Sequence, residues 1–460
     1  MTINPVEGIE SHLYAEEELV TFYDWLDLFL KIAERLSQEH PLKFSVEGTN
    51  YENIDYWRGL AYKCFTQQPT KAALNELNKL LMERDGVQPV QLGGTYVRHR
   101  RCVPNTSQMN TFIKHLPKAF KTTMGEEIFR IFCEEALRLG LISKHVAVYI
   151  DFTNKFFYGY LDTRNTEGIT GTNKGPGTKY TRKYGAMMIN SGTTRLFAGL
   201  FLTKKGKSKV PDILRGLELL RQWGFTIDYT VGDREFTNYD IVASLLAAGV
   251  MYLGSIKHTP TVKKAIKAYL AGETKAVIPF VLNPSPKSQY KQGPVECYLI
   301  MKPDRGTRLR DIQKQMAAGE ISEKDAMERV HTFTTTMHPP RERRRLVHWG
   351  LGLLKKFAKR WRIETAFRDL KRILPVSHAR NHATKTFMFI FQMVVYNAWQ
   401  FQRALHRKLR RVPKSWRLGE IHEADRRPNS DRSVRNLSGM SSLMNAVGNL
   451  KSEEEDQFHQ

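Results

Sequence analysis

Two segments, Val146-Ala-Val-Tyr-Ile-Asp151 and Thr226-Ile-Asp-Tyr-Thr-Val-Gly-Asp233, decide the fold of this chain. Each is a short, mostly apolar run that ends in a carboxylate, which is the pattern of a buried strand with an acid at its carboxyl end. Residues 237–248 are expected to form a helix and residues 250–256 a further strand. Because helix and strand alternate here, the sequence predicts an α/β sheet.

More strands are expected before and between these two segments. Alternating apolar and polar residues predict strands at 156–161, 184–190 and 195–202, and a helix is expected at 210–223. Several early strands followed by alternating helix and strand are the order of a ribonuclease-H-like sheet. We therefore expect a ribonuclease-H-like core over residues 146–256.

The alternation is interrupted at residues 257–340. Strands are expected at 276–282, 295–301 and 330–336, with a charged helical stretch at 311–329 among them. The sequence therefore predicts a β-rich insertion in the core.

The core is expected to be completed by helices at 341–405. One long helical pattern runs from Arg341 to about Leu374, and a strongly apolar helix follows at Phe387–Phe401. Residues 406–460 form a tail that is first basic and then acidic.

Residues 1–145 are expected to be mainly helical, with helical spacing of apolar residues in Leu19–Leu36 and Lys71–Met82. Pro104-Asn105-Thr106-Ser107 places a polar cap before a short amphipathic helix. A basic cluster lies just before it: Arg98, Arg100 and Arg101. This arrangement suits the reading helix of a helix-turn-helix, and we predict that the region binds DNA. A plain helical bundle has the same pattern, and the sequence leaves both interpretations open.

The charge of the chain indicates a polyanionic partner. Lys and Arg number 71 against 47 Asp and Glu, which gives a net charge of +24 at pH 7 in 460 residues. Such an excess is not needed for folding and is typical of nucleic-acid-binding proteins. A soluble basic protein without such a partner is the alternative that charge alone leaves open.

Other classes of protein are disfavoured. The longest apolar stretch, Phe387 to Trp399, is too short to span a bilayer and contains Gln392 and Asn397. The four cysteines form no Cys-x-x-Cys pair, which argues against a zinc site. The N-terminus lacks a basic-then-apolar signal pattern, so we expect a cytoplasmic protein.

Three carboxylates, Asp151, Asp233 and Glu364, are the candidate catalytic residues. Phosphoryl transfer between DNA strands needs an activated nucleophile and a stabilised leaving oxygen, and two divalent ions supply both. Mg²⁺ prefers hard oxygen ligands, so carboxylates from separate parts of a fold can hold it. For either aspartate alone, a loop or capping residue is the commoner explanation.

The residues around Glu364 add weight to this interpretation. Phe357, Arg360, Glu364 and Lys371 follow one another at spacings that place them within about a 60° arc of one helix, at roughly 100° per residue. An acid between two bases on one stripe can place a metal ligand beside phosphate contacts. The alternative is an exposed ladder of salt bridges, which is common on charged helices.

The segment Phe357–Lys371 resembles the Y-R-E-K signature of a large group of DDE insertion-sequence transposases, which reads Y-x-x-R-x-x-x-E-x-x-x-x-x-x-K. The R, E and K fall on Arg360, Glu364 and Lys371. Phe357 stands at the Y position, so the phenol hydroxyl of the signature is absent.

Three other segments resemble the same group, and the resemblance covers about residues 100–405. Tyr149-Ile-Asp-Phe-Thr153 is similar to its first-Asp strand, and Val231-Gly-Asp-Arg-Glu-Phe236 is similar to its second-Asp block. Lys174-Gly-Pro-Gly-Thr-Lys179 resembles its basic loop. The resemblance implies a ribonuclease-H-like catalytic domain in which Asp151, Asp233 and Glu364 hold Mg²⁺, for which Mn²⁺ can substitute.

The resemblance also implies a function and partners. The chain would bind the terminal inverted repeats of a DNA element, cut them and join them to target DNA, as a homodimer in a synaptic complex at the nucleoid. The DNA contacts implied are Phe357, Arg360, Lys371, Lys174 and Lys179. Two alternatives remain: a catalytically silent DNA-binding protein derived from a transposase, and a ribonuclease-H-fold nuclease that does not join strands.

Some members of the group release their element through a DNA hairpin, with a flipped base stacked on Trp. No Trp lies in residues 257–340. The aromatic residues that could stack a base instead are Tyr269, Tyr290, Tyr298 and Phe333.

Overall fold

The computed structural model places part of the chain well enough to describe. The described residues are 51, 53–66, 69–84, 102–116, 118–157, 169–170, 177–203, 207–288, 290, 293–372 and 382–408. The chain divides into two compact units: unit 1 comprises Met1–Ile131 and Asp369–Gln460, and unit 2 comprises Phe132–Arg368.

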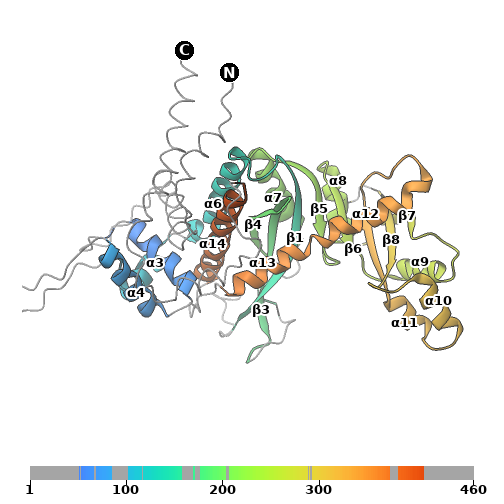
Figure 1. Ribbon diagram of the computed structural model, residues 1–460, viewed down its shortest axis with the longest axis horizontal. Helices are drawn as coiled ribbons and strands as arrows, with labels where there is room; N and C mark the ends of the chain where they lie inside the picture. Colours follow the sequence, from blue (N-terminus) through green and yellow to red (C-terminus); the bar gives the residue numbers. More distant parts are fainter. Residues whose placement is uncertain are drawn as a thin grey trace, which may run out of the picture. The chain divides into compact units, whose positions relative to one another are not determined.

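Unit 2 is built on one mixed sheet, which confirms the α/β class. Nine strands of the described residues join in the order β2-β3-β1-β5-β6-β9-β8-β7, with β4 also paired to β3. Figure 1 shows this sheet with helices packed along it. The strands are β1 (His145–Phe157), β2 (Ile169–Thr170), β3 (Tyr180–Ser191), β4 (Thr194–Leu202), β5 (Thr226–Gly232), β6 (Met251–Ser255), β7 (Val277–Leu282), β8 (Val295–Pro303) and β9 (Val330–Thr335).

Long strands come first and helices then alternate with strands, as the sequence predicted. β4, β3 and β1 are antiparallel neighbours, and β5 and β6 then run parallel to β1. Helix α7 (Val210–Gln222) connects β4 to β5, and α8 (Tyr239–Ala247) connects β5 to β6. The backbone of Gly216 in α7 lies so close to Met187 that an added Cβ would be 2.2 Å from its sulfur. Helix α7 therefore covers the face of the sheet that carries Met187.

The two strands expected at 146–151 and 156–161 are one strand, β1, as far as the structure describes them. The pairing of β1 with β5 ends at Ile150–Gly232, whereas its pairing with β3 continues to Phe157–Tyr180. Beyond Ile150 the hairpin leaves the middle of the sheet, so polar residues are tolerated there. That loss of apolar character, in Thr153-Asn-Lys155, made one strand look like two.

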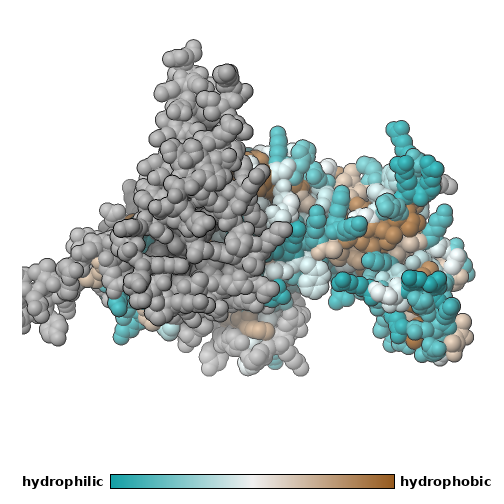
Figure 2. Space-filling model, in the orientation of Figure 1, coloured by the Kyte–Doolittle hydropathy of each residue, from teal (hydrophilic) through white to brown (hydrophobic). Residues whose placement is uncertain are grey.

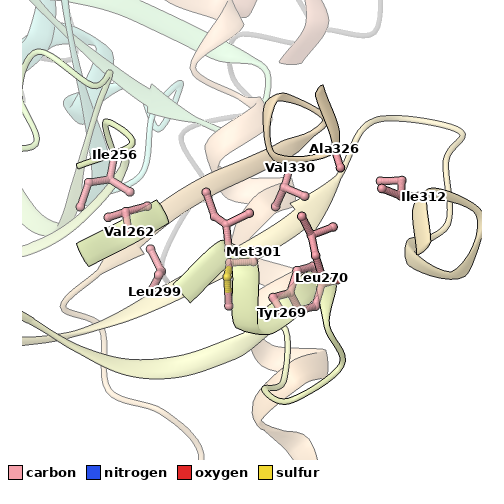
Figure 3. Packing of buried hydrophobic residues seen from close by; sticks show 10 residues of the cluster. Ile256, Val262, Tyr269, Leu270, Leu299, Met301, Ile312, Ala326 and Val330 are labelled. Carbon is pink, nitrogen blue, oxygen red and sulfur yellow. The ribbon is translucent and has the colours of Figure 1, made fainter. Parts of the chain in front are cut away.

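Residues 257–340 add both strands and helices. β9 pairs antiparallel with β6, and β8 and β7 follow, so the insertion continues the core sheet. Three helices accompany these strands: α9 (Pro260–Leu270), α10 (Leu309–Ala317) and α11 (Glu323–Glu328). Their apolar faces enclose a small core that includes Val262, Leu299 and Val330 (Figure 3).

Two expectations for the insertion were wrong in detail. The single helix expected at 311–329 is two helices, because Gly319 has a φ of +72° and Ser322 caps the second helix by accepting from Asp325 N. Helix α9 was not expected, although Thr259 accepts a hydrogen bond from Val262 N as its N-cap.

Figure 2 shows hydrophobic residues on the surface over α12 and β7, the elements that carry the exposed Leu351 and Val281.

The single helix expected from Arg341 to Leu374 is interrupted. After the short η1 (Arg343–Arg345) come α12 (Leu346–Ala358) and α13 (Trp361–Arg372). Between them, Arg360 N bonds to Phe357 O at 2.8 Å and Ile363 N to Arg360 O at 3.0 Å. These i to i+3 bonds tighten the turn, so residues 357–371 do not form one straight α-helical stripe.

Unit 1 is helical where it is described, with its own aromatic core. The helices at 71–82, after Pro104 and at 387–401 are confirmed, and Asn105 makes a capping box with Gln108. Trp57 stacks on Phe391 with ring centroids 5.9 Å apart. Its helices are α3 (Asn53–Thr66), α4 (Thr70–Arg84), α5 (Thr106–His115) and α14 (His382–Lys408), and α6 (Lys118–Arg138) runs into unit 2.

Some expectations cannot be compared with the structure. The helix at 19–36, the residues Arg98, Arg100 and Arg101 and the tail after 408 lie outside the described residues. None of the described helices is long and apolar enough to cross a membrane.

Candidate active site at the ends of β1 and β5

Asp151 lies in β1 one residue beyond the last pair with β5. Its side chain is buried, and the whole residue is 7% exposed. Its Oδ1 accepts a hydrogen bond from Phe152 N at 2.8 Å. The sequence placed Asp151 at the end of its strand, but β1 continues beyond it to Phe157. Asp151 lies where the parallel part of the sheet ends, and its buried carboxylate is at that edge.

Asp233 follows β5 directly, as the sequence predicted. Its Oδ1 accepts from Glu235 N at 2.8 Å, which closes a tight turn. Thr237 Oγ1 ties this turn to β6, with Tyr252 Oη at 2.8 Å and Ser255 O at 2.6 Å. Gly232 is required before the acid, because a Cβ there would lie 2.8 Å from the Cβ of Phe236.

Glu364 lies in the first turn of α13, which is anchored on the sheet. Arg362 Nη1 donates to Asn190 Oδ1 at 2.7 Å, and the ring of Phe367 is 5.8 Å from that of Phe197. Asn190 and Phe197 flank the turn between β3 and β4. These contacts hold Glu364 on the same face of the sheet as Asp151, since Asn190 is paired with Ala147 and residues 147 and 151 have the same parity in β1.

Arg360 joins two of the acids. Its Nη1 is 3.2 Å from Asp151 Oδ2 and 2.6 Å from Glu364 Oε1. The side chain of Arg360 is 13% exposed, so this contact is largely shielded from water. The sequence predicted that Arg360 faces phosphate beside the site, and in the structure its guanidinium faces two of the carboxylates.

The protonation of Asp151 reflects its neighbours. Burial raises the pKa of Asp151 to about 7, and the nearby charge of Arg360 opposes this rise. The negative charges of Asp233 and Glu364 raise the pKa of Asp151 further. Two acids from distant parts of the sequence are thus close enough to influence the carboxyl group of Asp151.

The acids suit a divalent cation by their chemistry, because carboxylate oxygens are the hard ligands that Mg²⁺ prefers. The positive group that Asp151 and Glu364 share in this structure is the guanidinium of Arg360. In the described part of the chain, no three acid, histidine or cysteine side chains converge closely enough to hold a metal ion. The three acids therefore have the chemistry that a divalent cation prefers but are not gathered around one point, and Arg360 contacts two of them.

A basic cluster that the sequence did not predict lies next to these acids. Lys183 and Lys209 both lie over the ring of Phe152 and contact Glu235. No signal in the sequence marks them as a group, because they come from β3, the start of α7 and β1. Glu235 was visible only as part of the segment around Asp233.

The other predicted residues are scattered. The ring of Phe357 packs edge-on against Phe333 at 4.8 Å, and the guanidinium of Arg360 lies 5.5 Å from its centroid. Lys179 is exposed, 5.7 Å from the ring of Tyr180. The side chain of Lys371 and the whole of Lys174 lie outside the described residues.

Two of the aromatic residues considered for base stacking are engaged elsewhere. Tyr269 is 6% exposed and belongs to the core of the insertion. Tyr298 packs edge-on against Trp349 at 5.6 Å.

Comparison with known proteins gives little guidance. No protein-family model and no curated protein matches this chain. Among solved structures, the chain is similar to a piggyBac transposase in a synaptic complex with hairpin DNA, at 11% identity over 92% of this chain and 79% of that one, with a TM-score of 0.42. A likeness at this level is no evidence for the activity of the chain.

Proposed function

We propose that this protein is a DNA transposase of the DDE class, which cuts the ends of a DNA element and joins them to target DNA. The observation that carries the proposal is the buried Asp151 at the edge of the sheet, which is influenced by the charges of Asp233 and Glu364 and shares Arg360 with Glu364. Placing two further acids near a buried carboxyl group costs free energy unless a cation compensates them, so such a cluster is not expected from folding alone.

The topology of unit 2 supports a ribonuclease-H-like core. Three antiparallel strands are followed by two strands parallel to β1, and helices form both crossovers. In this arrangement the first and second acids leave adjacent parallel strands at the same end. Ligands of open α/β sheets commonly bind at that end.

Asp151, Asp233 and Glu364 would hold Mg²⁺, with Mn²⁺ able to replace it. When bound, the metal ions would polarise the phosphodiester and favour deprotonation of the attacking water or hydroxyl. The contribution of Arg360 is to balance the charge of the acids, and its planar guanidinium can bind a phosphate through two hydrogen bonds. The anchored α13 keeps Glu364 in place without help from the ligand.

The test uses purified full-length protein, Mg²⁺ and DNA that carries the inverted repeats flanking its coding region. We expect Asp151→Asn, Asp233→Asn and Glu364→Gln each to lower cleavage by about 1,000-fold or more while end binding persists, because each change removes one charged ligand at nearly constant shape. Glu218→Gln, at an exposed position of α7, is the control.

The products discriminate the candidates. Strand transfer supports the transposase, cleavage without joining supports a nuclease, and binding without cleavage supports a silent DNA-binding protein. Near-normal cleavage by any of the three variants would remove that acid from the catalytic set.

A further inference from the structure

Lys183 and Lys209 converge on one aromatic ring although they come from different elements. The Nζ atoms of Lys183, in β3, and of Lys209, just before α7, lie 4.3 Å and 4.2 Å from the centroid of Phe152. Phe236 stacks on the same ring with centroids 4.3 Å apart. Because that stack covers one side of the ring, both ammonium groups share the other side.

One carboxylate serves both lysines. Glu235 Oε2 contacts Lys183 Nζ and lies 3.9 Å from Lys209 Nζ. The two lysines thus share one contacting carboxylate, and the more distant charges of Asp233 and Lys257 act on Lys209 in opposite directions. Burial lowers the pKa of Lys209, and the charge of Lys183 lowers it further. The free protein therefore holds like charges together at a cost that an added anion would relieve.

The cluster lies beside the carboxylates but on the other face of the sheet. Successive side chains of a strand point to opposite faces, so Phe152 and Asp151 face opposite ways. Glu235 follows Asp233 within the same tight turn. The side chains of Lys183, Lys209 and Glu235 are 20%, 30% and 40% exposed, so a ligand can reach them.

We infer that Lys183 and Lys209 bind a phosphate oxyanion, a backbone phosphate of DNA, which takes the place of Glu235. A phosphodiester carries a single negative charge, so it would replace the charge of Glu235 between the two ammonium groups. The face of Phe152 holds the ammonium groups together and excludes water from one side of them. This inference rests on the proposed function for the identity of the ligand as DNA.

The first experiment measures binding of a mixed-sequence DNA duplex by fluorescence anisotropy across a salt series, without divalent metal. We expect Lys209→Met, which keeps the packing on Phe152, to weaken binding several-fold and to reduce the slope of log K against log salt by about one. Glu235→Gln is expected to strengthen binding several-fold, because it removes the competing carboxylate. Lys183→Met is the second variant in case one does not fold.

The controls come from a matched ion pair elsewhere in unit 2. Lys267 contacts Glu323, and both side chains are about half exposed, at 54% and 51%. Lys267→Met and Glu323→Gln should leave both the affinity and the salt slope unchanged. Thermal melts in sodium phosphate against sodium chloride form the second arm, in which phosphate should raise the Tm of the wild type and of Glu235→Gln but not of Lys209→Met.

Three results overturn the inference. If all the lysine variants keep the salt slope, or if Glu235→Gln weakens binding, the cluster is a structural ion pair. If phosphate protection depends on Lys209 but DNA binding does not, the site takes free phosphate and not DNA. Cleavage assays separate this from the proposed function: a wild type that never cleaves, with a salt slope that still depends on Lys209, refutes the transposase and keeps the phosphate site.

Discussion

The two faces of the sheet at the edge beyond Ile150 carry opposite excesses of charge. On the face covered by α13, Asp151 and Glu364 share the guanidinium of Arg360, with Asp233 close by. On the face covered by α7, Lys183 and Lys209 share the carboxylate of Glu235. Each cluster contains one residue of opposite charge. Arg360 lies where the proposed metal ion would bind, and Glu235 lies where the proposed phosphate would bind.

This difference suggests how a site remains stable without its ligand. Uncompensated buried charge is costly, and a single internal counter-charge reduces the cost without filling the site. Arg360 has the sign of a metal ion and Glu235 the sign of a phosphate. If both residues substitute for a ligand, removing either one should destabilise the fold but raise the affinity for the corresponding ligand. The following predictions test this.

The largest effect is expected at Arg360. Arg360→Lys keeps the charge but loses the planar donor group, and we expect cleavage to fall about 10- to 100-fold, since hydrogen bonds to charged groups are worth about 1.5–3 kcal/mol. Arg360→Ala should lower cleavage further and yet tighten Mg²⁺ binding in calorimetry, because the competing cation is gone. Arg368→Lys, at an exposed position of α13, is the control. Weaker Mg²⁺ binding by Arg360→Ala would show that Arg360 does not substitute for a metal ion in the way that Glu235 is proposed to substitute for a phosphate.

The next effect concerns pH and Asp151. Its pKa is about 7 in the folded protein against an ordinary 3.8, so between these values the folded state holds a proton that the unfolded chain has released. As pH rises through this interval, the free energy of unfolding therefore falls by roughly 1.4 kcal/mol per pH unit, up to about 4 kcal/mol in total. Above pH 7 this group causes no further change in the free energy of unfolding.

Asp151→Asn removes this titration. Without metal, its Tm at pH 7.5 should exceed that of the wild type by several degrees and should vary less between pH 5 and 7.5. Mg²⁺ affinity of the wild type should rise from pH 6 to 8, since the metal must displace the proton. Glu320→Gln, at an exposed acid, should leave the pH dependence of Tm intact. A wild-type Tm that rises across this interval would contradict the assignment.

A smaller effect is expected at Arg362, which anchors α13 to Asn190 and to the carbonyl of Gly192. Arg362→Ala should cost about 1–3 kcal/mol of unfolding free energy, because partners are left without a donor. Cleavage should fall less than in Arg360→Ala, since Arg362 contacts neither acid. Denaturant unfolding and cleavage rates measured in parallel would show whether α13 is positioned by this contact.

The smallest effect is expected at Phe357, where the related signature has Tyr. Phe357 is partly exposed and packs edge-on against Phe333. We expect Phe357→Tyr to change the unfolding free energy by less than about 1 kcal/mol, because a hydroxyl that reaches water is not left unpaired. DNA binding should be unchanged or stronger. A loss of about 1–3 kcal/mol would mean that the hydroxyl is buried.

Local patterns predicted much of unit 2. β5 with its terminal Asp233, the helix α7 and the strands β7 to β9 follow from apolar periodicity and from breaks at polar residues. The interruption before Trp361 was not predictable, because neither Gly nor Pro marks it and the tight turn depends on i to i+3 backbone bonds.

The candidate site was only partly predictable, because its contacts depend on how separate segments pack together. The strand ends pointed to Asp151 and Asp233, and the resemblance to the Y-R-E-K group joined them with Glu364 as a set. The contacts of Arg360 with two of them, and the meeting of Lys183 and Lys209 over Phe152, depend on strand register and on the packing of α13 and α7. The spacing of residues within a single segment predicts neither the contacts of Arg360 nor the convergence of the two lysines.

The pairing of β9 with β6 has a consequence for self-association. Without the insertion, β6 would end the sheet with a row of unpaired backbone groups, which can template pairing with another chain. Among the described strands, the insertion moves this free edge to β7. There Pro279 removes one backbone donor from a short strand, so edge-to-edge pairing of two copies through β7 is disfavoured. Two copies that assemble on DNA would then have to meet through side chains and not by extending their sheets past this edge.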